Sequence, residues 1–520
     1  MSEAPRSSES DAPERPCGRA RKDRRRRRRS RRVLLGVGAV LVLALGYGIA
    51  DSYDHVPGVL TVSPEVVAEP VPQPRATAGS AWAADTDDSP SAEAPLPTDI
   101  TGVLDGLVED PRFAGPLGVE VADALTGDVL YSHRAEATHT PASTTKVFTA
   151  GAALAELGAD STLSTRALVS GGWVAEGSDN TEETGTTSIP AVHLVGGGDV
   201  LLGAGASDAG AVNGHAGLAT LAADTAAVLA EHGEDTVEVT VDESRWAGPR
   251  FNAGWARADI GNGYIAPMSP LMTDSGYTPA EGDEARTTTP AWVAGQAFVR
   301  ALREAGVTAD LVGFGDDRTA SAETAPAGVV EVAVVESAPV SALVRHMLLY
   351  SDNVVAEALG REISLARGGD GSAADAPVAV LAALADAGID PGATTLEDTS
   401  GLDYGNAIAA RDLVRVLTTA ATDTGDLSRL VPGLPVSGLS GSLFERYEDT
   451  DTRAAAGDVR AKTGTLSTVN SLAGTVLTAD GRLLVFAVLA DGQTPGSAWS
   501  TRAAIDEAIA GLASCGCGGT

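Results

Sequence analysis

The apolar and polar positions of the chain change their pattern several times, and each change marks a predicted segment. The first long apolar run is 33–50, which contains no charged residue. As a helix this run would span roughly 27 Å, close to the hydrocarbon thickness of a bilayer, so we predict a transmembrane signal-anchor. Residues 51–97 show no sustained period and are rich in Pro, Ala, Ser and acidic residues, which predicts a flexible, disordered linker.

From residue 98 the pattern becomes that of a folded body. Alternating apolar and polar runs predict a β-hairpin near Gly127 and a second hairpin, late in the chain, near Gly481. Helical periodicity fills much of the remaining sequence. We assign residues 98–168 and 328–514 to the two parts of one main domain, in which an antiparallel sheet is covered by helices.

The segment between these two parts, 169–327, has a different character. Short apolar runs alternate there with Gly-rich turns, and one helical run, 216–229, interrupts them. We interpret the segment as a large, mainly β insertion. The predicted fold class is therefore α+β, with the main domain split by this insertion.

Charge is distributed unevenly between the N-terminus and the rest of the chain. Residues 1–32 carry 13 Lys and Arg against 5 Asp and Glu, which leaves 24 against 65 for the remainder. Positive charge before the apolar run predicts that this basic tail stays in the cytoplasm and that the body is extracytoplasmic. Cleavage after the small residues near Ala50, which would release a secreted body, stays open. The acidic body is expected to repel nucleic acid.

The three cysteines lie close to the ends of the chain, at Cys17, Cys515 and Cys517. They provide neither a disulfide framework nor the spacing of a zinc site, so we predict no metal and no other cofactor. Residues 515–520 are interpreted as an exposed tail, with a local redox pair as the alternative.

Two lysines of the body are candidates for chemistry. The chain has only three lysines, and Lys146 and Lys462 are those outside the basic tail. All other basic residues of the body, counting Lys and Arg, are Arg. Two retained lysines therefore indicate that a titratable amine is needed at these positions, because Arg does not give up its proton. Ser143 stands three residues before Lys146, so on a helix its hydroxyl is within reach of the amine. A serine becomes nucleophilic when such a neighbour takes its proton.

Three short motifs stand in order along the chain: Ser143-Thr-Thr-Lys146, Ser351-Asp-Asn353 and Lys462-Thr-Gly464. This set is typical of β-lactamases and penicillin-binding proteins. A second Ser-Asp-Asn begins at Ser178, in a polar stretch without an apolar period. We therefore assign the second motif to the copy that begins at Ser351.

With these motifs the sequence resembles the class C low-molecular-mass penicillin-binding proteins, the type-4 D-alanyl-D-alanine carboxypeptidases and endopeptidases. The resemblance covers residues 100–492 and includes further blocks: His193-Leu-Val-Gly-Gly-Gly-Asp199, Tyr264-Ile-Ala-Pro-Met-Ser-Pro-Leu271, Ser400-Gly-Leu402 with Asn406, and Leu434-Pro-Val-Ser-Gly-Leu-Ser-Gly441. It implies a transpeptidase-like domain split by inserted domains, peptidoglycan stem peptides as substrates and β-lactams as acylating inhibitors.

The resemblance also implies roles in proton transfer. Ser143 would be the acylated nucleophile and Lys146 its base. Ser351 and Asn353 would line the cleft, and Ser351 would relay a proton to the leaving amine.

Further roles concern the substrate's negative charges. Lys462 would hold the terminal carboxylate, with Thr463, Gly464 and Thr465 beside it. The backbone N–H groups of Ser143 and Thr465 would form the oxyanion hole.

The sequence departs from the family pattern in one block: the family often has Ser-Gly-Leu-Ser-Arg-x-Asn, and this chain has Ser400-Gly-Leu-Asp403-Tyr404-Gly-Asn406, so Tyr404 stands where the family often has Arg. This change affects how a diaminopimelate carboxylate would be held. Asp242 resembles the family's acidic residue in the insertion, a possible partner for the substrate's side-chain amine; a turn residue at the end of a strand is the alternative.

Three other functions are considered. A serine β-lactamase would share the motifs, but the separation of 208 positions from Ser143 to Ser351 argues against it. A Ser-His-Asp esterase lacks its Gly-x-Ser-x-Gly elbow here. The alternative that is not an enzyme is a wall-associated scaffold protein with a catalytically idle site.

Overall fold

The computed structural model describes residues 99–170, 189–277, 285–314 and 329–515, all within one compact unit, 79–520. The predicted basic tail 1–32, apolar segment 33–50 and linker 51–97 lie outside the described residues. Among the helices that the structure describes, none combines the length and the apolar character needed to cross a bilayer. The transmembrane segment and the linker therefore stay predictions.

The main domain is built on a five-stranded sheet in which every neighbouring pair is antiparallel. Its strands, in spatial order, are β10 (Val459–Leu466), β11 (Val469–Leu477), β12 (Leu483–Ala490), β1 (Leu117–Asp123) and β2 (Val129–His133). The two predicted hairpins are confirmed as β1–β2 and β11–β12. Pairing of β1 with β12, from Leu117 opposite Ala490, closes the two parts of the domain into one sheet.

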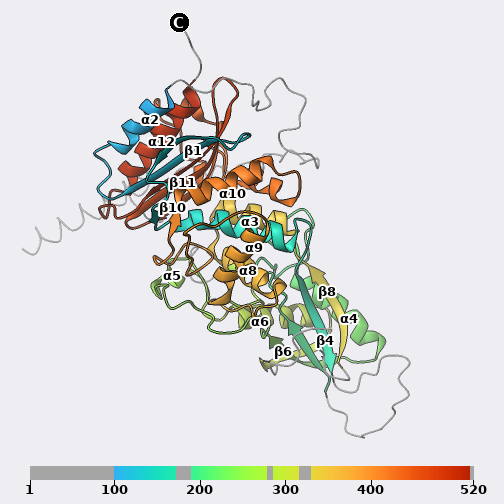
Figure 1. The fold of residues 1–520 in the computed structure, drawn as a ribbon. Coiled ribbons are helices and arrows are strands. Elements are labelled where there is room, and N and C mark those ends of the chain that lie inside the picture. Colours follow the sequence, from blue (N-terminus) through green and yellow to red (C-terminus); the bar gives the residue numbers. More distant parts are fainter. Residues whose placement is uncertain (1–98, 171–188, 278–284, 315–328, 516–520) are drawn as a thin grey trace, which may run out of the picture. The chain divides into compact units, whose positions relative to one another are not determined.

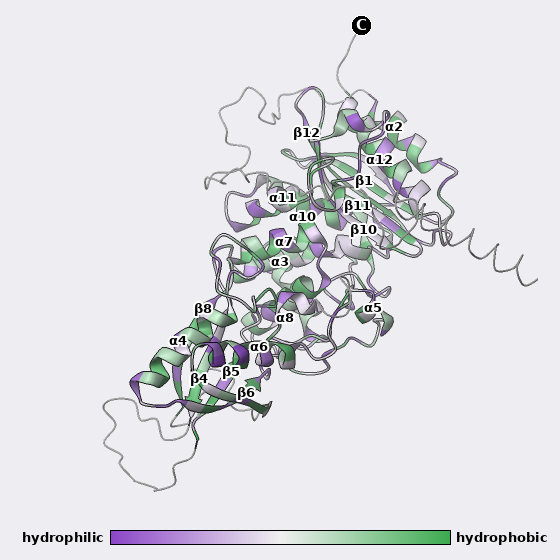
Figure 2. Cartoon of the chain, turned by 180° about the vertical axis from the view of Figure 1, so that it is seen from behind, coloured by the Kyte–Doolittle hydropathy of each residue, from purple (hydrophilic) through white to green (hydrophobic). Residues whose placement is uncertain are grey.

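Helices cover both faces of this sheet, which explains why every residue of β1 and β12 is buried. Successive residues of β12 point to opposite faces. Phe486 packs with α2 (Ile100–Val108) and α12 (Ala498–Ser514), whereas Val485 packs with α10 (Ala410–Thr422). The layers are visible in Figure 1, and Figure 2 shows the apolar strands between them.

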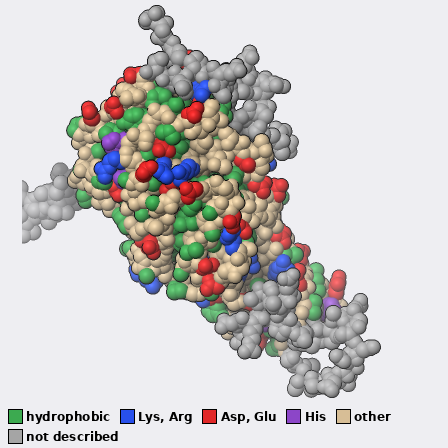
Figure 3. All heavy atoms as spheres, viewed as in Figure 1, with side chains coloured by type: hydrophobic (Ala, Val, Ile, Leu, Met, Phe, Trp, Pro, Cys, Tyr) green, Lys and Arg blue, Asp and Glu red, His purple; other side chains and the backbone are tan. Residues whose placement is uncertain are grey.

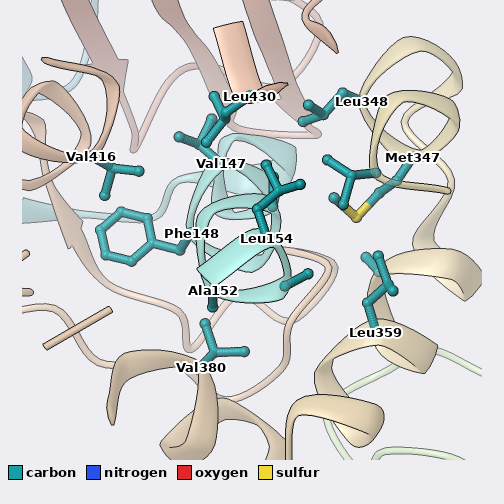
Figure 4. Close-up of a cluster of buried hydrophobic side chains, with 14 of the residues drawn as sticks. Val147, Phe148, Ala152, Leu154, Met347, Leu348, Leu359, Val380, Val416 and Leu430 are labelled. Atoms are coloured by element: carbon teal, nitrogen blue, oxygen red, sulfur yellow. The ribbon is translucent and has the colours of Figure 1, made fainter. Parts of the chain in front are cut away.

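The helical part of the main domain surrounds α3 (Lys146–Leu157) with α10 and with three further helices: α7 (Val340–Tyr350), α8 (Asn353–Ala366) and α9 (Asp375–Asp386). Every residue of α3 from Lys146 to Leu154 is buried. Figure 4 shows Phe148 and Leu154 among side chains from the neighbouring helices. Burial all around a helix is typical of a domain centre, so α3 is held in place from several sides.

The inserted region has a second five-stranded sheet with two helices packed on it. The strands, in spatial order, are β7 (Thr308–Phe314), β6 (Thr236–Asp242), β5 (Ala191–Val195), β4 (Ser164–Ser170) and β8 (Val330–Glu336). The helices are α4 (Leu218–Glu231) and α6 (Pro290–Glu304). The pairs β5–β6 and β6–β7 are parallel.

These parallel pairs correct the expectation of a mainly β insertion with a single helix. Parallel neighbours need a crossover, usually a helix, and α4 and α6 each stand between two consecutive strands that pair in parallel. The region is therefore mixed α/β. Its sheet also extends beyond the predicted limits 169–327, because β4 begins at Ser164 and β8 ends at Glu336.

The remaining described elements are short. They are β3 (Thr138–His139), β9 (Ile408–Ala409), α5 (Ala258–Gly261), α11 (Leu430–Gly433) and the 3-10 turns η1 (Ala142–Thr145), η2 (Asp274–Gly276), η3 (Asp426–Arg429), η4 (Gly441–Leu443) and η5 (Arg453–Ala455). Acidic side chains are spread over the face seen in Figure 3, in keeping with the net charge of −33 of the whole chain.

Candidate active site

Ser143 and Lys146 meet where a 3-10 turn runs into the central helix. Ser143 lies in η1, and α3 begins at Lys146. The Lys146 Nζ lies 3.1 Å from the Ser143 Oγ, which is hydrogen-bond distance. The turn is fixed by its own side chains, because the Thr144 and Thr145 hydroxyls donate to the carbonyls three residues earlier, at 2.7 and 2.9 Å. The predicted pair of nucleophile and amine is thus formed by local structure.

Lys146 is completely buried and donates to two further oxygens. The Nζ lies 2.6 Å from the Asn353 Oδ1 and 2.6 Å from the Ser400 carbonyl oxygen. Burial lowers the pKa of Lys146 to about 8, against the opposing charges of Asp398, Asp352 and Glu357. A lysine with this pKa is partly neutral near physiological pH and can accept a proton from Ser143.

The second motif forms a sharp junction between α7 and α8. Ser351 ends α7 with a left-handed backbone, φ 56°, and Asp352 caps α8 by accepting from the N–H groups of Val354 and Val355. Asn353 connects two sides of the site, because its Oδ1 accepts from Lys146 and its Nδ2 donates to the Tyr264 carbonyl at 2.9 Å. The other copy of the motif, at Ser178, lies outside the described residues.

The third motif lies on β10, the strand at the edge of the main sheet and beside η1. Lys462 is completely buried, and its Nζ donates to the Thr463 carbonyl at 2.9 Å. Burial lowers the pKa of Lys462 well below its usual range, and the charge of Lys146 lowers it further. Gly464 permits close packing, because a Cβ there would stand 2.6 Å from the Pro141 carbonyl oxygen.

A cleft of about 1240 Å³ brings the three motifs together. Its lining includes five of the predicted residues: Ser143, Ser351, Asn353, Thr463 and Thr465. The two lysines lie buried behind this wall. Segments separated by more than 300 residues in the sequence thus contribute the Ser143 hydroxyl and the Asn353 carboxamide to one cleft, with two buried amines behind its wall.

The comparisons with known proteins agree with this geometry. The model of the D-Ala-D-Ala carboxypeptidase 3 (S13) family matches residues 100–289 and 280–512. The chain belongs to this family. The resemblance found in the sequence is thereby confirmed.

Relatives of this S13 protein include two mycobacterial carboxypeptidases. One, from Mycobacterium tuberculosis, is 36% identical over 457 residues, which is 87% of this chain and 91% of the relative. The other, carboxypeptidase DacB of Mycolicibacterium smegmatis, is 36% identical and covers 82% of this chain and 86% of its own. Penicillin binding protein 4 of Haemophilus influenzae has a similar fold, with a TM-score of 0.61 at 21% identity, over 80% of this chain and 98% of that chain.

Asp242 is the one predicted site residue that the structure of this S13 protein places elsewhere. It ends β6, is buried, and borders a separate cavity rather than the cleft. Its Oδ1 accepts from the Ser244 N–H at 2.8 Å, which is the turn at a strand end that we gave as the alternative. The acidic residues that do line the cleft are Asp259, Asp274 and Asp352.

Sequence reasoning also missed the loop that contacts Lys146 in this S13 protein. The Ser400 carbonyl accepts from Lys146, and a backbone oxygen carries no residue-type signal. Gly401 shows how closely the loop approaches the turn that carries Ser143, because its φ is 84° and a Cβ there would stand 1.9 Å from the Ala142 carbonyl oxygen. The block Ser400-Gly-Leu, noticed only through the resemblance, was the available signal.

Proposed function

We propose that this protein is a serine D,D-carboxypeptidase and D,D-endopeptidase. It cleaves D-Ala-D-Ala ends or D-Ala cross-links of peptidoglycan stem peptides through an acyl-enzyme on Ser143. The observation that carries the proposal is the contact of the Ser143 Oγ with the buried amine of Lys146, beside a cleft behind which a second buried lysine lies. Membership of the S13 family supports it.

Acylation follows from the positions of these groups. Neutral Lys146 takes the proton of Ser143, and the Oγ attacks the carbonyl carbon of the penultimate D-Ala. The oxyanion that forms is held by the backbone N–H groups of Ser143 and Thr465. When the C–N bond breaks, the leaving amine receives a proton through Ser351, and water later releases the acyl group from Ser143.

Lys462 binds the terminal carboxylate in this proposal, together with the hydroxyls of Thr463 and Thr465, which line the cleft. Burial lowers the pKa of Lys462 when no substrate is bound. A carboxylate placed beside a buried amine favours the charged form, so substrate binding raises the pKa of Lys462 again. A β-lactam carries a carboxylate at a similar distance from its reactive carbonyl. It therefore acylates Ser143 by the same steps.

The rate of acylation is expected to rise with pH through about 8, because only neutral Lys146 accepts the serine proton. Burial lowers the pKa of this amine, so below pH 8 it is mostly charged. The rate should fall about tenfold for each further pH unit below about 7. The measurement is the second-order rate of labelling by a fluorescent penicillin between pH 6 and 9, with circular dichroism to show that the fold persists. A rate that does not change over this range would contradict Lys146 as the base.

We also propose that the body is extracytoplasmic and is held at the cell membrane by residues 33–50, on the evidence of the apolar run and the preceding arginines. Protease added to intact cells whose wall has been digested should degrade the body and spare a cytoplasmic marker. A protected body, or a mature N-terminus at Asp51, would contradict the anchored form; the latter result would instead indicate secretion.

A further inference from the structure

Asp398 lies in the loop behind the base, and its carboxylate is completely buried. Six donors, at 2.7 to 3.2 Å, reach its two oxygens: the N–H groups of Ser400, Gly401 and Asp403, the Ser400 hydroxyl, the Asn406 amide and the Trp255 indole. Each oxygen accepts from at least two N–H groups, so neither carries a proton. Asp398 is therefore an ionised group that determines the shape of the loop around it.

This loop contacts Lys146 through a hydrogen bond and packs against the turn that carries Ser143. The Ser400 carbonyl accepts from the Lys146 Nζ at 2.6 Å, and the Thr399 carbonyl accepts from the Thr149 hydroxyl of α3 at 2.6 Å. Gly401 packs on the Ala142 carbonyl, immediately before Ser143. A change in the loop would therefore displace one of the three acceptors of the lysine.

Charge gives Asp398 a second effect on Lys146. The titratable groups that face this amine are Asp398 from the loop, Asp352 and Glu357 from the start of α8, and Lys462 from β10. Asp352 also faces Arg286 at 3.7 Å and caps α8. Burial, and after it the charge of Asp398, raises the pKa of Glu357 to about 8, so Glu357 is mostly protonated at neutral pH.

We propose that Asp398 is a positioning residue for the acylation reaction. It holds the Ser400 carbonyl against Lys146 and supplies the buried negative charge that balances the protonated base. The inference rests on the proposed function, because it assumes that Lys146 accepts the proton of Ser143.

The inserted region takes part in this arrangement through Trp255. This residue lies between β6 and α6, and its indole N–H donates to Asp398 at 2.9 Å. Trp255 is buried against the main-domain core. The insertion thus contributes to the position of the base as well as to the walls of the cleft.

The test is the pH dependence of penicillin acylation in Asp398→Asn, a substitution of equal size without the charge. At pH 9, where Lys146 is largely neutral, the rate should fall about tenfold or more, because an amide leaves buried N–H donors of the loop without an acceptor. The midpoint of the acidic limb should move to lower pH by about one unit, because loss of the negative charge favours the neutral amine. A purely structural role would lower the rate without moving the midpoint.

Asp412→Asn is the matched control. Asp412 is a buried carboxylate of the same domain, on α10, and its hydroxyl partner is Thr394. This variant should lose stability without a change in the midpoint. Asp398→Glu, which keeps the charge but moves it, should acylate slowly with a midpoint near that of the unmodified protein.

A third variant covers the case in which Asp398→Asn does not fold. Trp255→Phe removes one donor and leaves the carboxylate, so acylation should slow several-fold with an unchanged midpoint. A normal rate in Trp255→Phe, or a normal rate and midpoint in folded Asp398→Asn, overturns the positioning role. Failure of the proposed function is distinguishable, because then the unmodified protein itself would not be labelled.

Discussion

Replacing Ser143 by Ala is expected to abolish both acylation by penicillin and release of D-Ala from a pentapeptide. The Ser143 Oγ lies beside the buried amine of Lys146 and at the cleft, and its loss removes the atom that forms the acyl bond in the proposed reaction. Loss of an activated nucleophile typically lowers turnover by a factor of about 10³ or more. The chain should remain folded, because Ser143 is only partly buried.

The measurement is intact-mass analysis of the body, beginning near residue 97, after exposure to penicillin. The unmodified protein should gain one covalent increment per chain, which maps to the peptide containing Ser143, and the variant should gain none. The adduct should be long-lived, because no residue is expected to direct water onto the bulky penicilloyl ester. Rapid turnover of a chromogenic cephalosporin would instead favour a β-lactamase.

Two outcomes would count against this assignment. An adduct on another serine, such as Ser351 or Ser440, would show that the nucleophile was misassigned. No adduct at all on a protein with a normal circular dichroism spectrum would favour the idle scaffold. Ser440→Ala is a suitable control, because the Ser440 hydroxyl accepts from the Val436 N–H outside the cleft lining and should be dispensable for labelling.

The second large effect is expected from exchanging each body lysine for Arg. Lys146→Arg should abolish acylation, because Arg stays protonated and cannot accept the proton of Ser143. Lys462→Arg should keep a positive charge for the substrate carboxylate and lower acylation by about tenfold, mainly through weaker binding. Both amines are completely buried, so the larger guanidinium also has to be accommodated at each position.

The two variants serve as controls for one another, since each introduces the same bulk at a buried site. The readout is the labelling rate at several penicillin concentrations, which separates binding from the acylation step. Thermal unfolding of both variants shows whether either has lost its fold. Equal losses in two folded variants, or normal labelling of Lys146→Arg, would mean that the roles of the lysines are misassigned.

Local patterns in the sequence predicted the main domain well. Strand alternation with Gly turns gave two hairpins of the main sheet, β1–β2 and β11–β12, but not the pairing of β10 with β11, and helical spacing gave the buried α3. Each of these signals lies within about 20 residues of chain, where periodicity reports which side chains face a core. The insertion was predicted less well, because α6 and the parallel pairing of its strands were not anticipated.

The sequence by itself determined the chemistry, because scarce lysines and short motifs specify which groups are present. Only the tertiary structure decided where those groups act. It buried Lys146 and Lys462, and thereby lowered the pKa of each amine. It placed Asp242 outside the cleft and supplied the Ser400 carbonyl from a loop that Asp398 holds. Burial and backbone contacts depend on segments far apart in the chain, and no local pattern of residue types encodes them.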